Sequence, residues 1–188
     1  MSDTNFKIAI DLHGTYDQMP ELFEKYLFTL PSTDIYIFSG SPKEDINNYL
    51  ASRVSEITDP NIMNMMKRVQ LLSIVDYCFE QGLPMEPRVS ERSGRESWYF
   101  KGDEAIWWAM KGIICQKHGI NLLIDDKEEY LNFINIGRNI MPKFILFKGL
   151  NGEPATKTDF IRLFSPAWST FAGIHPALAF QTTRQFKD

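Results

Sequence analysis

Polar side chains that can bind a cation or a phosphate group follow most of the short apolar runs in this sequence. They are Asp11 after the run at 6–10, Ser39 and Gly40 after 35–38, Lys101 after 98–100, and Asp125 with Asp126 after 120–124. Carboxylates are preferred ligands of Mg²⁺, and a carboxylate can also attack phosphorus as a nucleophile. Hydroxyl and ammonium groups stabilise the charge on phosphate oxygens. Brought together, these groups predict metal-assisted phosphoryl transfer.

The spacing of apolar residues indicates which elements must position these groups. The runs at 6–10, 35–38, 98–100, 120–124 and 144–147 are typical of short buried strands. Helical periodicity lies between them, at 18–30, 42–57, 61–80, 103–118 and 127–136. This alternation predicts an α/β fold, a three-layer Rossmann-like arrangement around a mainly parallel five-stranded sheet. In such sheets ligands bind beyond the carboxyl ends of the strands, where the polar residues would meet.

The length of the chain suits one domain, or one domain that carries a modest insertion. The sequence has 188 residues, of which 44% are hydrophobic, and this is enough for a core without disulfides or structural metal. We expect a catalytic core at 1–150, within which the helix and polar loop at 61–96 form at most a small cap element. The aromatic-rich segment at 151–188 is predicted to pack on that core as an extension.

Charge and cysteine content argue against several classes of protein, although a small local basic patch for nucleic acid is not excluded. The net charge is −4 and no basic tract is present, so nucleic acid is not an expected partner. Cys78 and Cys115 do not have the spacing of a zinc site or of a disulfide framework. No apolar run reaches the roughly 18 residues of a membrane-spanning helix, so we expect no membrane association and a cytoplasmic location.

Four short motifs occur in an order that resembles a known family of enzymes. They are Asp11-Leu12-His13-Gly14-Thr15, Phe38-Ser39-Gly40, Lys101, and Leu123-Ile124-Asp125-Asp126. Over residues 6–147 this order resembles the haloacid-dehalogenase-like (HAD) hydrolases. The first motif of that family is Asp-x-Asp-x-Thr at a strand end. Its second ends a strand in Ser or Thr, its third is a lysine, and its fourth ends a strand in acidic residues.

The resemblance implies a Mg²⁺-dependent phosphohydrolase that forms an aspartyl-phosphate. Asp11 would be the nucleophile, with Asp11, Asp125, Asp126 and the backbone carbonyl of His13 as metal ligands. Ser39, Gly40 and Lys101 would bind the phosphate, and Lys101 would also act in catalysis. Only a minimal cap is expected, which in this family implies a phosphorylated macromolecule or a small phosphorylated substrate enclosed by a second subunit. The substrate is not identified, and a homo-oligomer is compatible with either case.

The residue at position 13 departs from the family pattern. HAD phosphatases have an acidic residue there, which exchanges a proton with the leaving oxygen, whereas this chain has His13. Because the pKa of histidine is near ~6.5, His13 could perform this proton transfer. It could equally hydrogen-bond a loop carbonyl. The second reading predicts a degenerate HAD-like module that binds metal and phosphate without efficient turnover.

Two assignments have alternatives within the sequence. Lys111 and Lys117 compete with Lys101 for the role of the site lysine, but Lys111 is predicted near the middle of a helix, from which a strand end is hard to reach. Lys101 is therefore preferred. Asp125 and Asp126 could simply cap the following helix, and Glu129 is a weaker candidate metal ligand than either of them.

Other folds and surfaces fit the sequence less well. A receiver domain would carry its acidic pair after the first strand, whereas here the pair comes late. Phosphate-binding glycine loops of the nucleotide-binding folds are not found in the sequence. The basic residues Arg88, Arg92 and Arg95 could contact a phosphorylated substrate, although a solvated loop is the simpler reading. Trp107 and Trp108 are adjacent on a predicted helix and point about 100° apart, so one is expected in the core and the other at its rim.

Overall fold

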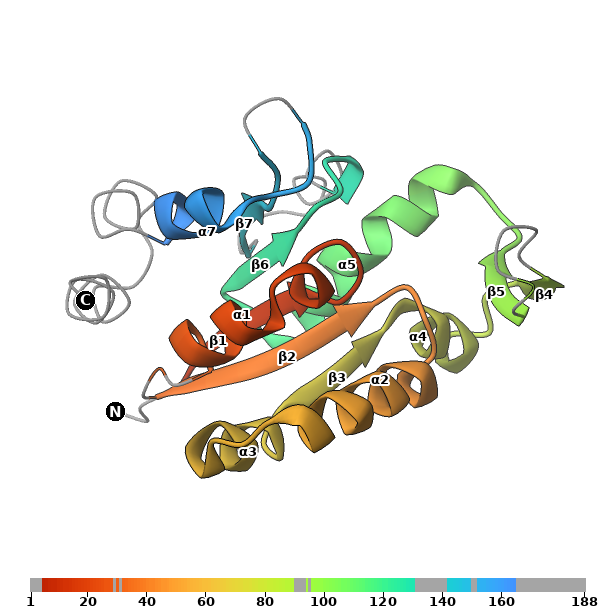
Figure 1. The fold of residues 1–188 in the computed structure, drawn as a ribbon. Helices are drawn as coiled ribbons and strands as arrows, with labels where there is room; N and C mark the ends of the chain where they lie inside the picture. Colours follow the sequence, from red (N-terminus) through yellow and green to blue (C-terminus); the bar gives the residue numbers. More distant parts are fainter. Residues whose placement is uncertain are drawn as a thin grey trace.

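The central sheet of the protein has five parallel strands, in the order β3-β2-β1-β6-β7. The computed structural model in Figure 1 describes residues 5–28, 30, 32–89, 94, 96–130, 142–149 and 152–164. The strands of this sheet are β1 (Phe6–Asp11), β2 (Thr33–Ser39), β3 (Gln70–Ser73), β6 (Leu122–Asp125) and β7 (Lys143–Leu146). The predicted three-layer α/β architecture is therefore confirmed.

Helices cover both faces of this sheet. They are the short 3₁₀ helix η1 (Tyr16–Gln18), α1 (Pro20–Tyr26), α2 (Lys43–Glu56), α3 (Pro60–Met66), α4 (Ile74–Glu80), α5 (Glu104–His118) and α7 (Lys157–Leu163). Ile8 and Ile10 of β1 pack in the core that includes residues of α1, α2 and α7, whereas Ala9 packs in the core on the α4 and α5 side. The same alternation holds along β2 and β6, as expected for strands buried on both faces.

The third strand of the sheet differs from the prediction. The expected helix at 61–80 is interrupted by β3, whose residues Gln70–Ser73 pair with Tyr36–Ser39 of β2. A four-residue strand between two helices presents too few residues for a period of two to be seen, and its pairing with β2 overrides the local helical pattern.

The predicted strand at 98–100 belongs to a separate hairpin. β5 (Glu96–Phe100) pairs antiparallel with β4 (Met85–Val89), and the predicted loop at 84–96 therefore contains a strand. This two-stranded hairpin lies apart from the central sheet, next to the start of α5 (Figure 1). It is the small additional element that the core carries between β3 and α5.

The start of α2 also differs from the prediction. The predicted helix at 42–57 starts at Pro42, whereas in the structure Pro42 is the N-cap and makes no side-chain bond to the helix. A neighbouring helix supplies the missing acceptor, because the amide of Lys43 donates to Asp76 of α4 at 2.8 Å. The hydrogen bond that caps α2 therefore comes from another helix and not from a residue beside the helix start.

A buried ion pair joins α1 to α2 on one face of the sheet. The Glu24 carboxylate is 2% exposed and accepts hydrogen bonds from Arg53 at 2.8 and 2.9 Å and from the Tyr16 hydroxyl at 2.7 Å. On the same side, Phe160 of α7 packs against Phe23, with ring centroids 5.1 Å apart. The part of 151–188 that the structure describes thus contacts the core, and Trp168, Phe171, Phe180 and Phe186 lie outside the described residues. Within the described ranges no helix has the length and apolarity to cross a bilayer.

Candidate functional site

Strand alternation directs two acidic side chains to the same side of the sheet. On β1, Ala9 faces α5, so Asp11, two residues later, faces the same way. On β6, Leu123 faces α5, and Asp125 follows it by the same rule. Because Ile10 pairs with Ile124, the two acids are neighbours at the carboxyl edge of the sheet. One carboxylate oxygen from each of Asp11, Asp125 and Asp126 lies within 4.8 Å of the other two.

A buried lysine from α5 contacts both of these acids. The Lys111 side chain is 1% exposed, and its ammonium group forms an ion pair with Asp11 and another with Asp125, at 2.5 Å. The argument that a lysine in the middle of this helix could not reach a strand end is therefore wrong. α5 begins beside the hairpin and runs back across the sheet (Figure 1), and helical side chains point toward the N-terminus of their helix. The side chain of Lys111 thus extends toward the carboxyl edge.

The preferred lysine of the sequence analysis does not join this cluster. Lys101 follows β5 and is exposed, and its amide donates to the carbonyl of Pro84 within the hairpin. Lys117 is half-exposed and lies 3.7 Å from Glu80. The reason for the difference is that Lys101 was placed after a strand of the central sheet, whereas the structure places that strand in the hairpin.

Burial and mutual repulsion shift the pKa values of the acids in the cluster. Burial, with further repulsion from Asp125 and Asp126, raises the pKa of Asp11 to about 7 even though Lys111 opposes the shift. Burial likewise raises the pKa of Asp125, against the effect of Lys111. For Lys111, burial alone would lower the pKa, but Asp11 and Asp125 more than offset it and the pKa lies above its ordinary value. The lysine therefore stays charged, and the raised pKa values of Asp11 and Asp125 show that this one ammonium group does not offset the burial of these two acids.

The turn after β1 brings Asp126 against the backbone. Gly14 has φ +86°, and a Cβ at this position would lie 2.6 Å from an oxygen of Asp126. Only glycine combines this conformation with so close an approach. Among the described residues, the buried atoms Asp126 Oδ1 and Thr15 Oγ1 have no hydrogen-bond partner. Since buried polar atoms are nearly always paired, both atoms are suited to a ligand that is not a protein group.

Two aromatic rings contact the ammonium group of Lys111. The Lys111 ammonium lies 4.4 Å from the ring centroid of Tyr130 and 5.3 Å from that of Phe38. Cation–π contacts of this kind stabilise a charged group without adding a competing anion. Burial is the main cause that raises the pKa of Tyr130 to about 12, so its hydroxyl stays protonated at neutral pH.

Ser39 and Gly40 end the strand next to Asp11. Ser39 is 1% exposed, and its hydroxyl accepts a hydrogen bond from the amide of Ser41 at 3.1 Å. Among the described residues no group accepts its hydroxyl proton, which can therefore be donated to a ligand. A Cβ on Gly40 would lie 3.4 Å from the ring of Trp107, so a side chain here would press against that indole. The predicted phosphate-binding pair thus lies at the carboxyl edge of β2, the strand beside β1.

His13 lies at the surface of the site. Its side chain is 60% exposed, and its Nδ1 lies 3.4 Å from a carboxylate oxygen of Asp17. The other oxygen of Asp17 accepts from the amide of Gly14 at 2.7 Å, which fixes this carboxylate in the turn. The contact with Asp17 raises the pKa of His13 above its ordinary value, and burial only partly opposes it. Neither Asp17 nor this pairing was predicted from the sequence.

The remaining candidates occupy different surroundings. Glu129 is exposed. Lys127, which the sequence analysis did not single out, lies 3.5 Å from Asp126, and its amide donates to Asp125 at 2.9 Å. This bond joins the Asp125 carboxylate to the amide two residues later and forms a local turn, because Asp125 is the last residue of β6 and does not cap a described helix. Arg88 pairs with Glu86 on the hairpin, and Arg92 and Arg95 lie outside the described residues.

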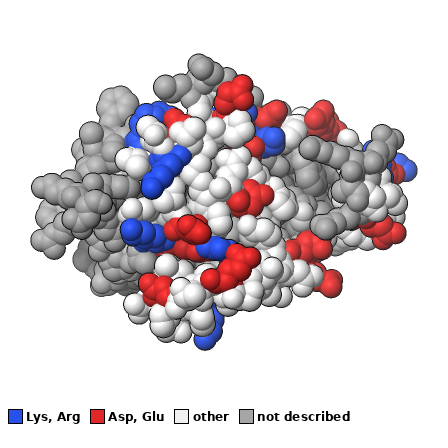
Figure 2. All heavy atoms as spheres, in the orientation of Figure 1, with Lys and Arg blue, Asp and Glu red and all other residues white. Residues whose placement is uncertain are grey.

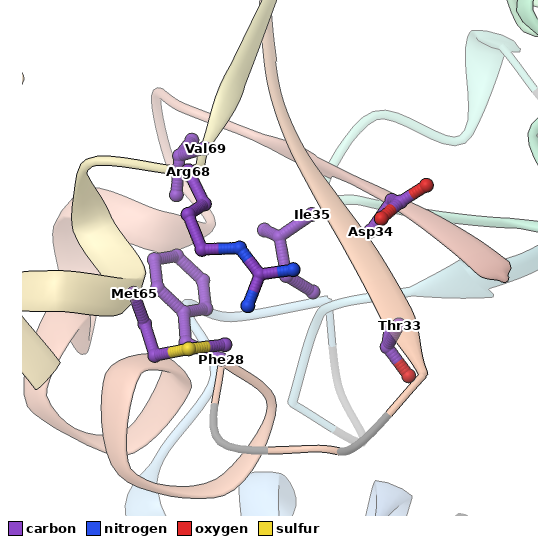
Figure 3. A pocket seen from close by; sticks show the side chains of 7 residues that line it. All are labelled: Phe28, Thr33, Asp34, Ile35, Met65, Arg68 and Val69. Carbon is purple, nitrogen blue, oxygen red and sulfur yellow. The ribbon is translucent and has the colours of Figure 1, made fainter. Parts of the chain in front are cut away.

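Two hollows away from the strand ends are too remote or too small to belong to the site. Figure 3 shows Arg68 pointing into a cavity of about 20 Å³ at the start of β2, where Thr33 and Asp34 lie, and this volume holds roughly one water. A larger hollow of about 360 Å³ is lined by residues of α2, α3 and β3, including Leu50, Val54 and Met66. On the face drawn in Figure 2, the described basic side chains lie among acidic ones and form no continuous basic area.

The comparisons with known proteins give no relative. No family model, no curated protein and no solved structure matches the chain. The fold and the site therefore define only a class of protein. The chain is a Rossmann-like α/β protein with an acidic cluster that could hold a metal ion at the carboxyl edge of its sheet.

Proposed function

We propose that the chain is a metal-dependent phosphomonoesterase in which Asp11 is the nucleophile, similar in mechanism to the HAD hydrolases that its motifs resemble. The observation that carries the proposal is the contact of Asp11 with the buried Lys111, beside two further acids whose oxygens lie within 4.8 Å of each other and of Asp11. A carboxylate that serves only the fold would not need two more acids beside it, because each raises the cost of ionising the others.

The residues around Asp11 supply the parts that phosphoryl transfer needs. Asp11, Asp125 and Asp126 would hold a divalent cation, for which Mg²⁺ is the candidate because the donors are oxygen atoms. Such a cation would neutralise the charge on the phosphate oxygens and on the attacking carboxylate. Lys111 and the hydroxyl of Ser39 would bind the remaining oxygens, in place of the role first given to Lys101. These groups are fixed in place before the substrate binds, which is the condition for electrostatic catalysis.

The reaction would proceed in two steps. A carboxylate oxygen of Asp11 forms a bond to phosphorus while the ester oxygen leaves with its bonding electrons and takes a proton from His13. Water then attacks the phosphorus of the aspartyl-phosphate, loses a proton to His13, and releases inorganic phosphate and the Asp11 carboxylate. The overall change is hydrolysis of one phosphoester bond. Asp17, 3.4 Å from His13, would stabilise the charged imidazole.

The test is hydrolysis of an aryl phosphate by the wild-type chain with and without Mg²⁺. The proposal expects activity that needs the cation and is lost in Asp11→Asn, a substitution that keeps the size of the side chain. Lys101→Met is the matched control, because Lys101 is exposed and lies on the hairpin. Equal activity of wild type and Asp11→Asn would refute the enzyme hypothesis.

A second candidate function is a binding or regulatory module with the same site but without efficient turnover. The exposure of His13, at 60% of its side chain, favours this reading because an acid/base group is usually held against its substrate. The module would be stabilised thermally by Mg²⁺ but would not hydrolyse esters. His13→Asp separates the two: a gain of activity indicates a degenerate enzyme, and a loss indicates that His13 acts in catalysis.

A further inference from the structure

Trp107 lies beside the candidate site. It precedes Lys111 by four residues on α5, so the two side chains lie on the same face of the helix. The helix α5 starts near the carboxyl edge of the sheet and runs back across it (Figure 1). Trp107 therefore lies about one helical turn nearer to that edge than Lys111. Two ring carbons of Trp107 lie 3.4 and 3.8 Å from where a Cβ on Gly40 would be. The indole therefore borders the strand end that carries Ser39.

Neighbouring groups fix the orientation of this indole. The ring of Phe100, from β5, stacks on it with an interplanar angle of 26° and centroids 6.4 Å apart. Behind Phe100, a Cβ on Gly102 would lie 2.5 Å from the ring, so glycine is what permits this packing. The hairpin thus packs on a half-buried tryptophan that borders the strand end of Ser39.

We propose that Trp107, backed by Phe100, forms a subsite for a flat conjugated ring in the leaving group of the substrate. This inference rests on the proposed function and names its substrate class: phosphomonoesters of an aryl or nucleoside alcohol. Lys111, Ser39 and the acidic cluster occupy the inner end of the site and suit the phosphate. A leaving group that extends past Gly40 meets an immobilised indole, and a flat ring gains most from such a surface because stacking adds to area burial.

The test measures binding of phosphonates, whose carbon–phosphorus bond is not cleaved, by calorimetry in the presence of Mg²⁺. Benzylphosphonate and cyclohexylmethylphosphonate have similar size, but only the first has a flat conjugated ring. Wild type is expected to bind the benzyl compound about fivefold more tightly. Trp107→Leu should remove the difference, and Trp107→Phe should retain part of it. Trp98→Leu is the control, because Trp98 lies on the hairpin against Phe79, with ring centroids 4.9 Å apart.

Several outcomes separate this inference from the proposed function. Equal affinity for the two phosphonates, or equal effects of Trp107→Leu and Trp98→Leu, would overturn the ring subsite even if esters are hydrolysed. A preference for the benzyl compound without any hydrolysis would support the subsite and overturn the phosphatase. Failure to bind either compound would overturn the subsite. A nucleoside 5′-methylenephosphonate, measured in parallel, tells whether a nucleotide or an aryl phosphate is the better fit.

Discussion

Replacing Lys111 by methionine should strongly destabilise the protein in the absence of a divalent cation. Its side chain is 1% exposed, and those of its partners Asp11 and Asp125 are 9% and 0% exposed. Methionine fills a similar volume but leaves two buried carboxylates without their cation. Removing one partner of a buried ion pair costs about 3–5 kcal/mol, and we expect a loss in this range. Lys101→Met, an exposed substitution, should change the free energy of unfolding by no more than about 0.5 kcal/mol.

The assay is urea denaturation of wild type, Lys111→Met, Asp11→Asn and the double variant. A pH near 8 is suitable because the pKa of Asp11 is raised to about 7 and the carboxyl is then mostly ionised. In EDTA, the double variant should be more stable than the sum of the single effects by about 1–3 kcal/mol, because Asp11→Asn removes one of the two unpaired charges. Saturating Mg²⁺ should reduce the loss caused by Lys111→Met, since the cation neutralises the same acids.

Two results would refute this reasoning. A loss below about 1 kcal/mol for Lys111→Met in EDTA would mean that the ion pairs with Asp11 and Asp125 do not form in solution, because their loss should cost several times more. Additive effects of the two single substitutions would mean that Lys111 and Asp11 do not interact. Either result would remove the electrostatic basis for placing a nucleophile and a cation at this strand end.

Two further substitutions test the turn and the helix contacts that support the site. Gly14→Ala should destabilise the protein by about 1–3 kcal/mol and weaken its stabilisation by Mg²⁺, since φ is +86° and the new Cβ would press on Asp126. Thermal unfolding with and without Mg²⁺ measures this against Gly82→Ala, where φ is +65° and nothing lies within 4 Å; an equal Mg²⁺ response in both variants would contradict it. Arg53→Met should cost about 3 kcal/mol in urea denaturation because it leaves the Glu24 carboxylate buried at 2% exposure without its cation, and a loss under about 1 kcal/mol would show that this ion pair does not form in solution.

Much of the fold could be predicted from the sequence because strand burial leaves a clear pattern. β1, β2, β6 and β7 are short apolar runs, and the alternation between their two faces follows from backbone geometry alone. The strand β3 could not be predicted from the sequence, because its four residues lie between two helices and only their pairing with β2 makes them a strand. The hairpin was missed in part because Met85–Val89 contains charged residues and a proline.

The acids of the site could be predicted, but its lysine could not. Asp11, Asp125 and Asp126 close strands, so the sheet alone brings them together. The position of Lys111 depends on which face of α5 is buried. The helix has apolar residues on more than one side, and two of them, Ile106 and Ile113, are 44% and 43% exposed. One feature of the sequence could have identified Lys111. It is the single charged residue among Trp107, Ile114 and Cys115, which lie on one face of the helix, and a charged residue on an apolar face indicates a buried partner of opposite charge.

The central proposal is that Asp11 attacks phosphorus. It is tested most directly by mixing the chain with an aryl phosphate, quenching in acid within the first turnover, and mapping phosphorylation by mass spectrometry. The expected result is one phosphoryl group on the peptide that contains Asp11, formed only with Mg²⁺ and absent in Asp11→Asn. Release of phosphate by wild type without any modification of this peptide, and at an equal rate in Asp11→Asn, would contradict the claim.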